Sequence, residues 1–352
     1  MTWLITGGAG YIGAHVVRAM TAAGEPVAVY DDLSTGDRAR VPDGVPFVHG
    51  STLDASCLRR AMSDLSVRGV VHLAAKKQVA ESMERPLHYY RENVQGLGTL
   101  LEAAADSGVR AFLFSSSAAV YGMPDVKRVT EDTPCAPVNP YGETKLAGEW
   151  MVRAAGRAHG MATASMRYFN VAGAAAPHLV DPGVFNLVPM VFEKLTEGAA
   201  PVVFGDDYDT ADGTCERDFI HVEDIASAHL AAAKALLGRG PGTDLTVNIG
   251  RGEGVSVREM IDLIGEVTGY GPAAEPVSAP RRPGDPARVV ASADRIGQEL
   301  GWSARHDVRA MVASAWEGWC GLHPAARRPS AEDPRRPSAE DPRRTSAESP
   351  TA

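Results

Sequence analysis

The sequence predicts an α/β fold in which a doubly wound parallel sheet is followed by a smaller C-terminal lobe. Three observations support this prediction. Short apolar runs alternate with longer amphipathic stretches through the first half of the chain, which is the rhythm of βαβ units. A glycine-rich turn joins the first apolar run to the first amphipathic stretch. Beyond about residue 170 the alternation gives way to a less periodic segment rich in proline and glycine.

The predicted elements follow one another in order along the chain. A further strand and helix over 219–237 are expected to rejoin the sheet, so we expect a first domain over 1–170 with a return segment at about 217–250. The second lobe is expected over 171–322. Strands are predicted at 3–6, 26–30, 69–73, 111–115 and 164–169, and the main helices at 11–23, 90–105 and 141–158.

Composition excludes several classes of protein. The 352 residues carry a formal net charge of −9, so the chain lacks the basic surface that nucleic acid binding needs. No apolar run reaches the roughly 18 residues of a membrane span, and the N-terminus does not read as a signal peptide. The four cysteines show no CxxC spacing and the histidines no metal-ligand spacing, so neither disulfides nor a metal are expected. We expect a cytoplasmic protein.

The C-terminal 26 residues differ from the rest. The octapeptide Arg-Arg-Pro-Ser-Ala-Glu-Asp-Pro occurs twice from Arg327 and then in a degraded third copy. A period of eight is too short for a solenoid unit, and the segment has no large apolar side chain to bury. We expect 327–352 to be a disordered tail.

The glycine-rich turn has the spacing of a dinucleotide site. Thr6-Gly7-Gly8-Ala9-Gly10-Tyr11-Ile12-Gly13 satisfies G-x-G-x-x-G between a predicted strand and a predicted helix. Absent side chains let the backbone approach a pyrophosphate at the helix N-terminus. Asp31 ends the next strand, where a carboxylate binds a ribose hydroxyl. Because Asp31 and Asp32 would repel a 2′-phosphate, the pattern predicts a Rossmann-like domain that binds NAD rather than NADP.

A second motif lies at the end of the predicted strands. Tyr141 and Lys145 are four residues apart, hence on one face of a helix. The serines 115–117 close a predicted strand, at the edge where open α/β sheets bind ligands. Together with the glycine fingerprint, this order is the arrangement of the short-chain dehydrogenase/reductase superfamily.

The resemblance extends to one family. Over nearly all of residues 1–320 the chain resembles the UDP-glucose 4-epimerases of the extended short-chain type. The stretch with Asp207-Tyr208 and Asp212-Gly213-Thr214 is the most specific, because it is typical of the epimerases. The motifs that carry the resemblance are Gly7–Gly13, Lys77 with Glu81-Ser82, Asn93-Val94, Ser115–Gly122, Pro140–Lys145, Arg167–Asn170, Phe204–Tyr208, Asp212–Thr214, Arg217–Val222 and Pro280–Asp285.

The resemblance implies roles for individual residues. Tyr141 would take the proton of the sugar 4-hydroxyl while C4 passes a hydride to NAD, Lys145 would favour the phenolate, and Ser117 would bind the reacting oxygen. The tyrosine needs about 4 kcal/mol of stabilisation to titrate near pH 7. NAD contacts are implied at Gly7, Gly10, Tyr11, Ile12, Gly13, Asp31, Asp32, Ser51, Thr52, Leu73, Lys77, Asn93, Ser115, Tyr141, Lys145 and Phe169. UDP-sugar contacts are implied at Ser117, Tyr141, Asn170, Asn186, Leu187, Phe204, Arg217, Arg282, Asp285 and Arg288.

Two departures and four alternatives accompany the resemblance, and the first alternative is another NAD-dependent nucleotide-sugar epimerase of the same fold. Ser51 stands where the family often has aspartate, which puts the affinity for adenine in question, and Ala119 replaces a frequent threonine. A nucleotide-sugar dehydratase or decarboxylase of the same fold would need a proton-transferring residue after the strand-end serines, where this chain has Ala118-Ala119. A non-catalytic NAD-binding regulatory protein would usually lack the tyrosine or the lysine.

Further expectations concern substrate and assembly. Counted from Arg282 and Asp285, Arg288 falls on the position that lines the sugar pocket, and its length predicts a pocket that excludes N-acetylated sugars. The family is commonly homodimeric through the helices near 90–105 and 141–158, so a homodimer is expected. Galactose metabolism, cell-wall sugar supply and a dedicated secondary pathway all stay open.

Overall fold

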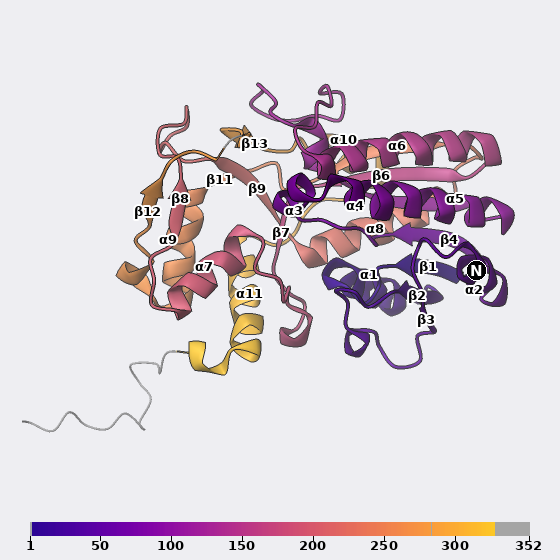
Figure 1. The fold of residues 1–352 in the computed structure, drawn as a ribbon, viewed down its shortest axis with the longest axis horizontal. Coiled ribbons are helices and arrows are strands. Elements are labelled where there is room, and N and C mark those ends of the chain that lie inside the picture. Colours follow the sequence, from indigo (N-terminus) through magenta and orange to yellow (C-terminus); the bar gives the residue numbers. More distant parts are fainter. Residues whose placement is uncertain (1, 283, 328–352) are drawn as a thin grey trace, which may run out of the picture.

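Seven parallel strands form the main sheet in the order β10-β6-β5-β4-β1-β2-β3 (Figure 1). The computed structural model describes residues 2–282 and 284–327. β2 and β6 are buried along their whole length, as strands are in a parallel sheet covered on both faces. The predicted doubly wound α/β fold is confirmed. The strands are β1 (Thr2–Thr6), β2 (Val27–Asp31), β3 (Phe47–His49), β4 (Val67–His72), β5 (Ala111–Ser117), β6 (Ala162–Tyr168) and β10 (Asp244–Ile249).

Helices cover both faces of this sheet. On one face α1 (Tyr11–Ala22) and α8 (Val222–Leu237) share a core with the strands. On the other face α2 (Ala55–Asp64), α5 (Gly96–Asp106) and α6 (Pro140–His159) enclose a second core. The two cores hold the carboxyl ends of β1, β4 and β5 in fixed positions, which matters because ligands bind at that edge.

The return segment differs from the expectation. The strand near residue 219 is β9 (Glu216–His221), which joins a second sheet rather than the main one. Its apolar half pairs with β7 (Asn170–Ala172), whereas α8 packs against α1 and β10 takes the edge of the main sheet beside β6. The expectation was wrong for the strand at 219, because an apolar run identifies a buried strand but not its neighbour. The helix and β10 of the same segment do return to the main sheet.

The helix expected over 90–105 is divided. A π-helical turn, η2 (Tyr90–Gln95), precedes α5, and the short helices α3 (Val79–Glu84) and α4 (Pro86–Tyr89) come before it. π-Helical turns widen a helix by one residue and occur frequently at functional sites. Here the wide turn contains Asn93, which is buried.

The C-terminal lobe has its own core. It starts at the carboxyl edge of the main sheet, because β7 follows β6 after one residue. Helices α7, α9 and α11 enclose this core on the side away from the sheet (Figure 1). The lobe contains α7 (Leu187–Thr196), β8 (Val202–Phe204), β11 (Gly254–Ser256), α9 (Val257–Thr268), β12 (Val277–Ala279), β13 (Arg288–Val289) and α11 (Val308–Leu322), while α10 (Asp294–Leu300) packs on α8 and β10.

The last two expectations from the sequence concern the C-terminal tail and membrane-spanning helices. The predicted tail, apart from residue 327, lies outside the described residues. Within the described ranges, no helix combines the length and the apolar character that crossing a membrane requires.

Candidate active site

The turn between β1 and α1 is built for close approach of a ligand to the backbone. Gly7 has φ of 72°, and a Cβ on it would lie 2.7 Å from the amide nitrogen of Ala74. A Cβ on Gly13 would lie 2.0 Å from the carbonyl oxygen of Gly7. Neither position accepts a side chain, so the turn leaves the N-terminus of α1 open to the pyrophosphate of a dinucleotide.

Asp31 lies next to this turn. Its Oδ2 accepts a hydrogen bond of 2.9 Å from the amide of Ala9, and its Oδ1 one of 2.8 Å from Leu33. Burial raises the pKa of the Asp31 carboxyl, and the two amides oppose this. Asp32 accepts from the amide of Ser34 at 2.9 Å. The Asp31 carboxylate has lone pairs left for a ribose, which is the chemistry that NAD requires there.

Asn93 and Lys77 lie along the same edge. The Asn93 side chain accepts from the amide of Lys76 at 2.8 Å and donates to its carbonyl at 2.9 Å. Asn93 also donates to Thr144 at 3.1 Å. The Nζ of Lys77 is 3.4 Å from the Oδ2 of Asp181. Asn93 therefore holds the segment that carries Lys77, and Lys77 links the two lobes.

The other expected cofactor residues are structural parts of the same region. Ser51 accepts at its carbonyl from the Tyr30 hydroxyl at 2.9 Å, and Thr52 fills the space beside Gly96. The Tyr11 hydroxyl donates to the carbonyl of Gly173 at 2.6 Å. Ile12 and Leu73 pack against the main core, and Phe169 is buried in a separate cluster that includes Tyr121 and Val289.

Tyr141, Lys145 and Ser117 come together at the end of β5. Asn139 caps α6 by accepting from the Gly142 amide at 2.8 Å, which fixes the first turn that bears Tyr141. The Nζ of Lys145 donates to the carbonyl of Ser115 at 2.7 Å and lies 5.9 Å from the centre of the Tyr141 ring. The Ser117 side chain lies close enough to the Tyr141 phenol to lower its pKa. The helix and the strand thus assemble the trio predicted from the sequence.

Burial acts on both ionisable members of this trio. It raises the pKa of the Tyr141 phenol, and the nearby Ser117 side chain partly opposes this rise. Burial lowers the pKa of the Lys145 ammonium to about 7, against the charge of Glu149, which raises it. Near neutral pH, small changes in the surrounding charge therefore decide whether Lys145 carries the proton that favours a phenolate.

The residues implied for the nucleotide half lie in the second lobe. Arg217 of β9 and Asp285 form an ion pair with Nη2 and Oδ1 2.5 Å apart. The Arg282 guanidinium lies 3.7 Å from the centre of the Phe204 ring. Asn170 is in β7, and Asn186 and Leu187 stand at the N-terminus of α7. Asn186 lines a small pocket together with Tyr11 and Asp181, so this part of the second lobe faces the cofactor turn.

Arg288 is engaged elsewhere. Its Nε and Nη2 contact the Glu216 carboxylate at 2.6 and 3.1 Å. The next residue, Val289, pairs with Arg217 and is buried with Phe169 and Tyr121. Because consecutive strand residues point to opposite faces, Val289 shares the face of Arg217 and Arg288 does not. The structure thus gives no support to a sugar pocket narrowed by Arg288.

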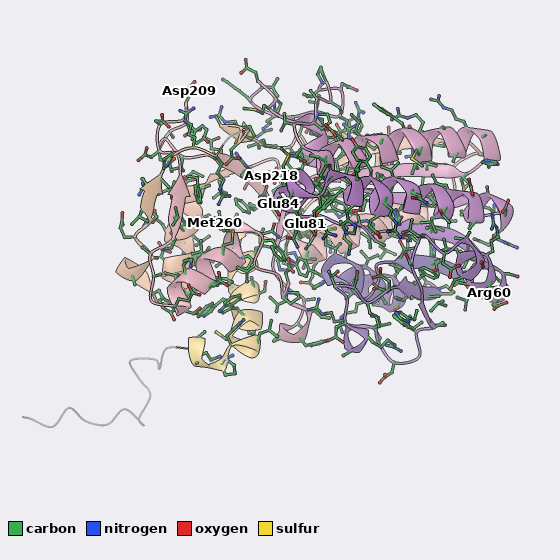
Figure 2. All side chains as sticks on the ribbon, in the orientation of Figure 1. Arg60, Glu81, Glu84, Asp209, Asp218 and Met260 are labelled. Atoms are coloured by element: carbon green, nitrogen blue, oxygen red, sulfur yellow. The ribbon has the colours of Figure 1, made fainter. Side chains whose placement is uncertain are left out.

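Asp218, labelled in Figure 2, fixes the strand on which Arg217 lies. Its carboxylate accepts hydrogen bonds from the amides of Arg251 at 2.8 Å, Gly252 at 2.9 Å and Ala291 at 3.2 Å. Burial raises its pKa to about 6, against those three amides. One carboxylate therefore ties β9 to two neighbouring loops.

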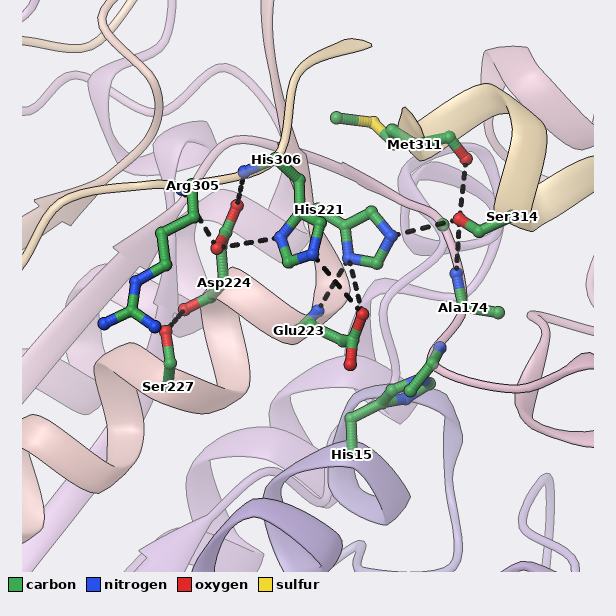
Figure 3. Close-up of polar contacts among 12 residues, drawn as sticks. His15, Ala174, His221, Glu223, Asp224, Ser227, Arg305, His306, Met311 and Ser314 are labelled. Carbon is green, nitrogen blue, oxygen red and sulfur yellow. Dashed lines mark hydrogen bonds and ion pairs between the residues drawn. The ribbon is translucent and has the colours of Figure 1, made fainter. Parts of the chain in front are cut away.

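A cluster of two histidines and acids lies at the end of β9 (Figure 3). His221, Glu223 and His306 have ligand atoms within 4.8 Å of one another, a grouping that could hold a metal. However, the Nδ1 of His221 accepts the Glu223 amide at 3.0 Å and so caps α8. Its Nε2 contacts the Ser314 hydroxyl at 3.0 Å, and its ring stacks on that of His306. These contacts use the ring nitrogens of His221 for linking α8 to α11.

Sequence reasoning missed the buried charges behind the trio. Glu149 is 1% exposed and forms an ion pair with Arg167, which is 4% exposed. The available signal was the spacing, because Glu149 follows Lys145 by four residues on the same helix face. Charged residues are rarely fully buried unless paired, so a sequence reading places both on the surface.

The fold and this site define a dinucleotide-binding α/β enzyme with a Tyr-x-x-x-Lys pair. Residues 3–250 match the model of the NAD dependent epimerase/dehydratase family. The chain belongs to this family, and the resemblance seen in the sequence is confirmed.

Three known proteins show the likeness in detail. A UDP-glucose 4-epimerase of Azospirillum brasilense is 46% identical over 321 residues, which is 89% of this chain and 91% of that protein. The structure of a UDP-glucose 4-epimerase from Stenotrophomonas maltophila with bound NAD and formylated UDP-arabinopyranose matches with a TM-score of 0.88 and 36% identity, covering 92% and 99% of the two chains. The UDP-Glc/GlcNAc 4-epimerase of Campylobacter jejuni matches with a TM-score of 0.80 and 37% identity, covering 91% and 99%.

Proposed function

We propose that the protein is a UDP-glucose 4-epimerase, an isomerase that interconverts UDP-galactose and UDP-glucose with NAD as its cofactor. The observation that carries this proposal is the meeting of Tyr141, Lys145 and Ser117 at the sheet edge beside the glycine turn. The relatives reported above are named as enzymes of this activity. NAD fits the turn because its glycines let the backbone fold tightly on itself: a Cβ at Gly7 would collide with the amide of Ala74, and one at Gly13 with the carbonyl of Gly7. This tight turn leaves the N-terminus of α1 open to a pyrophosphate.

The chain's own residues would handle the proton and the sugar oxygen. NAD, when bound, supplies the hydride acceptor for C4 of the sugar. Tyr141 takes the proton of the 4-hydroxyl and returns it after the transient 4-keto sugar has presented its other face. The Ser117 hydroxyl donates a hydrogen bond to the 4-oxygen, while the Lys145 ammonium stabilises the phenolate of Tyr141.

The second lobe would hold the nucleotide while the sugar turns. Arg217 and Arg282 present planar donors that match diphosphate oxygens, and Phe204 presents a ring against which a uracil base can stack. Arg282 covers the Phe204 ring in this structure, so a stacking base would require this guanidinium to move. An anchor at the nucleotide leaves the hexose free to rotate, which an epimerase needs.

Replacement of Tyr141 by Phe tests the proposal. Purified protein is incubated with UDP-galactose and no added NAD, and the product sugar is identified. The wild type should form UDP-glucose, and Tyr141→Phe should lose about 10²–10⁴-fold in kcat because only the proton acceptor is removed. NAD content by absorbance should be equal in both proteins. Near-normal epimerisation by the variant would refute Tyr141 as the base.

We also propose a homodimer in the cytoplasm. The family resemblance places the interface near α5 and α6, and large apolar side chains are exposed on the neighbouring elements: Met83 on α3 at 61%, Leu87 on α4 at 82% and Trp150 on α6 at 59%. α3 and α4 both contact α6, so these exposed side chains come from neighbouring helices. Light scattering should give a dimer for the wild type and a monomer for Leu87→Glu combined with Trp150→Glu.

A further inference from the structure

An acid is buried one helical turn beyond the lysine of the catalytic trio. Glu149 follows Lys145 by four residues in α6 and is 1% exposed, and Lys145 is 4% exposed. A buried carboxylate is costly unless it is hydrogen-bonded and paired. Its partners therefore show what the position requires.

The Glu149 carboxylate is satisfied on both oxygens. Its Oε1 accepts from the Ser116 hydroxyl at 2.5 Å and from the Nε of Arg167 at 2.8 Å. Its Oε2 accepts from the Nη2 of Arg167 at 2.7 Å. Arg167 in turn donates to the Tyr121 hydroxyl at 2.8 Å, and Tyr121 donates to Asn248 at 2.6 Å. The network joins α6 to β5, β6 and β10 in fixed geometry.

Ser116 is the point at which this network reaches the site. The carbonyl of its neighbour Ser115 accepts a hydrogen bond from the Lys145 ammonium, and the side chain of its other neighbour, Ser117, lies close enough to Tyr141 to lower the pKa of the phenol. A hydrogen bond from Ser116 to Glu149 thus fixes the strand end between the two residues that contact the catalytic pair. A displacement of that strand end would alter both contacts together.

The groups that face Lys145 come from several elements. The rings of Phe114 on β5 and Tyr141 on α6 lie 5.2 and 5.9 Å from its Nζ. His72 of β4 has its pKa lowered to about 3 by burial and by the Lys145 charge, so it is neutral at physiological pH. The negative charge of Glu149 raises the pKa of Lys145 and so opposes the effect of burial. Arg167 offsets part of its charge.

We propose that Glu149 is a positioning residue for the epimerase reaction, which keeps Lys145 protonated in its buried site and fixes the end of β5 through Ser116. The inference rests on the proposed function, because it assumes that Tyr141 is the base and that Lys145 favours its phenolate. Without the negative charge of Glu149, Lys145 loses its proton at lower pH. The phenolate of Tyr141 then lacks its neighbouring cation and forms only at higher pH.

The pH profile of kcat tests this role. In Glu149→Gln, the acidic limb of this profile, where kcat rises with pH, should move to higher pH by about 0.5 to 1 unit. At pH 7, kcat should fall by about 3- to 10-fold, with KM for UDP-galactose nearly unchanged. Glu149→Asp keeps the charge and should restore the limb. Ser116→Ala keeps the ion pair of Glu149 with Arg167 but releases the end of β5, so it should lower kcat while leaving the acidic limb at the same pH. An unmoved limb in Glu149→Gln would overturn the proposal, whatever the loss in kcat.

A second variant covers the case in which Glu149→Gln does not fold. The double variant Glu149→Gln with Arg167→Gln removes both charges, and replacing a buried pair as a unit is tolerated better than breaking it. Its acid limb should also move upward, by less, and an unmoved limb again overturns the proposal. Tyr141→Phe is measured in parallel. If it stays active, the proposed base is wrong, whereas an inactive Tyr141→Phe with an unmoved Glu149→Gln limb rejects the role of Glu149 alone.

Discussion

At the cofactor turn the groups that face a ligand are backbone amides, and the residues that matter there are glycines held between β1 and α1. In the second lobe the corresponding groups are long side chains, with Arg217 paired to Asp285 and Arg282 lying on Phe204. Backbone groups have no rotamers to order, whereas each arginine loses side-chain entropy when it binds. The glycines of the cofactor turn should therefore tolerate no added side chain, whereas substitutions of the arginines in the second lobe should have graded effects.

The largest effect is expected at the glycine turn. Gly13→Ala places a Cβ 2.0 Å from the Gly7 carbonyl oxygen, so the turn must open and NAD should be lost together with activity. The measurement is the NAD content of the purified protein after denaturation. Gly240→Ala is the matched control, because a Cβ there meets no atom within 4 Å. Full NAD content in Gly13→Ala would contradict the backbone cradle.

A graded effect is expected in the second lobe. Arg217→Lys keeps the charge but loses the planar donors, so KM for UDP-galactose should rise about 10- to 100-fold while NAD content stays full. Arg288→Lys is the matched control, since Arg288 pairs with Glu216 on the other face. Steady-state kinetics on both variants make the comparison. Equal KM changes in the two variants would show that substrate binding does not distinguish the sheet face of Arg217 from the face of Arg288.

The third prediction concerns the stability at low pH that depends on His221, which lies at the junction of the two lobes. Burial lowers the pKa of His221 to about 4, whereas an unfolded histidine titrates near pH 6.5. Stability from neutral His221 is therefore present above about pH 6.5 and is lost as the pH falls toward 4, by about 2 kcal/mol at pH 5. His221→Asn keeps an acceptor for the Glu223 amide and should flatten this loss.

Denaturant unfolding at pH 7 and pH 5 measures that difference. Asp218 acts in the opposite direction, because its folded pKa of about 6 makes it bind a proton more readily in the folded state. The contribution of Asp218 is the same in the wild type and in His221→Asn. The difference between the two proteins in their loss of unfolding free energy from pH 7 to pH 5 is therefore the contribution of His221. Parallel losses in the two proteins would argue against the prediction.

The smallest effect is expected at Arg288. Arg288→Ser breaks a partly exposed ion pair with Glu216, which costs about 0–1 kcal/mol of unfolding free energy. Because the guanidinium points away from the face of Arg217, the ratio of kcat/KM for UDP-N-acetylglucosamine over UDP-glucose should stay within about a factor of two. A clear gain on the N-acetylated sugar would restore Arg288 to the sugar pocket.

The contrast between the halves also explains what could be predicted from the sequence. The glycine turn, Asp31 and the Tyr141–Lys145 pair are local patterns with fixed spacing, and the structure brings them to one sheet edge. The partners Glu149 with Arg167 and Arg288 with Glu216 are 18 and 72 residues apart in the chain. Periodicity shows where a residue lies in its own element, whereas these pairs depend on how distant elements meet.

The same limit accounts for the strand near residue 219. Its apolar pattern gave a strand, but only the tertiary arrangement decides between two sheets that lie end to end. The π-helical turn at Tyr90–Gln95 is a comparable case, since one extra residue per turn leaves no mark in an apolar pattern of period near 3.6.

The path of β10 has a consequence for how the protein is made. The edge strand β10 and helix α8, which packs on α1, both belong to the NAD-binding half of the molecule. In the chain, however, they come after α7 and β8 of the second lobe. A ribosome therefore releases residues 1–170 with α8 still missing from the core that it shares with α1, and that core closes only when about 250 residues have emerged. A fragment cut at residue 170 should aggregate when expressed alone, so the two halves are one unit of folding although they hold different ligands.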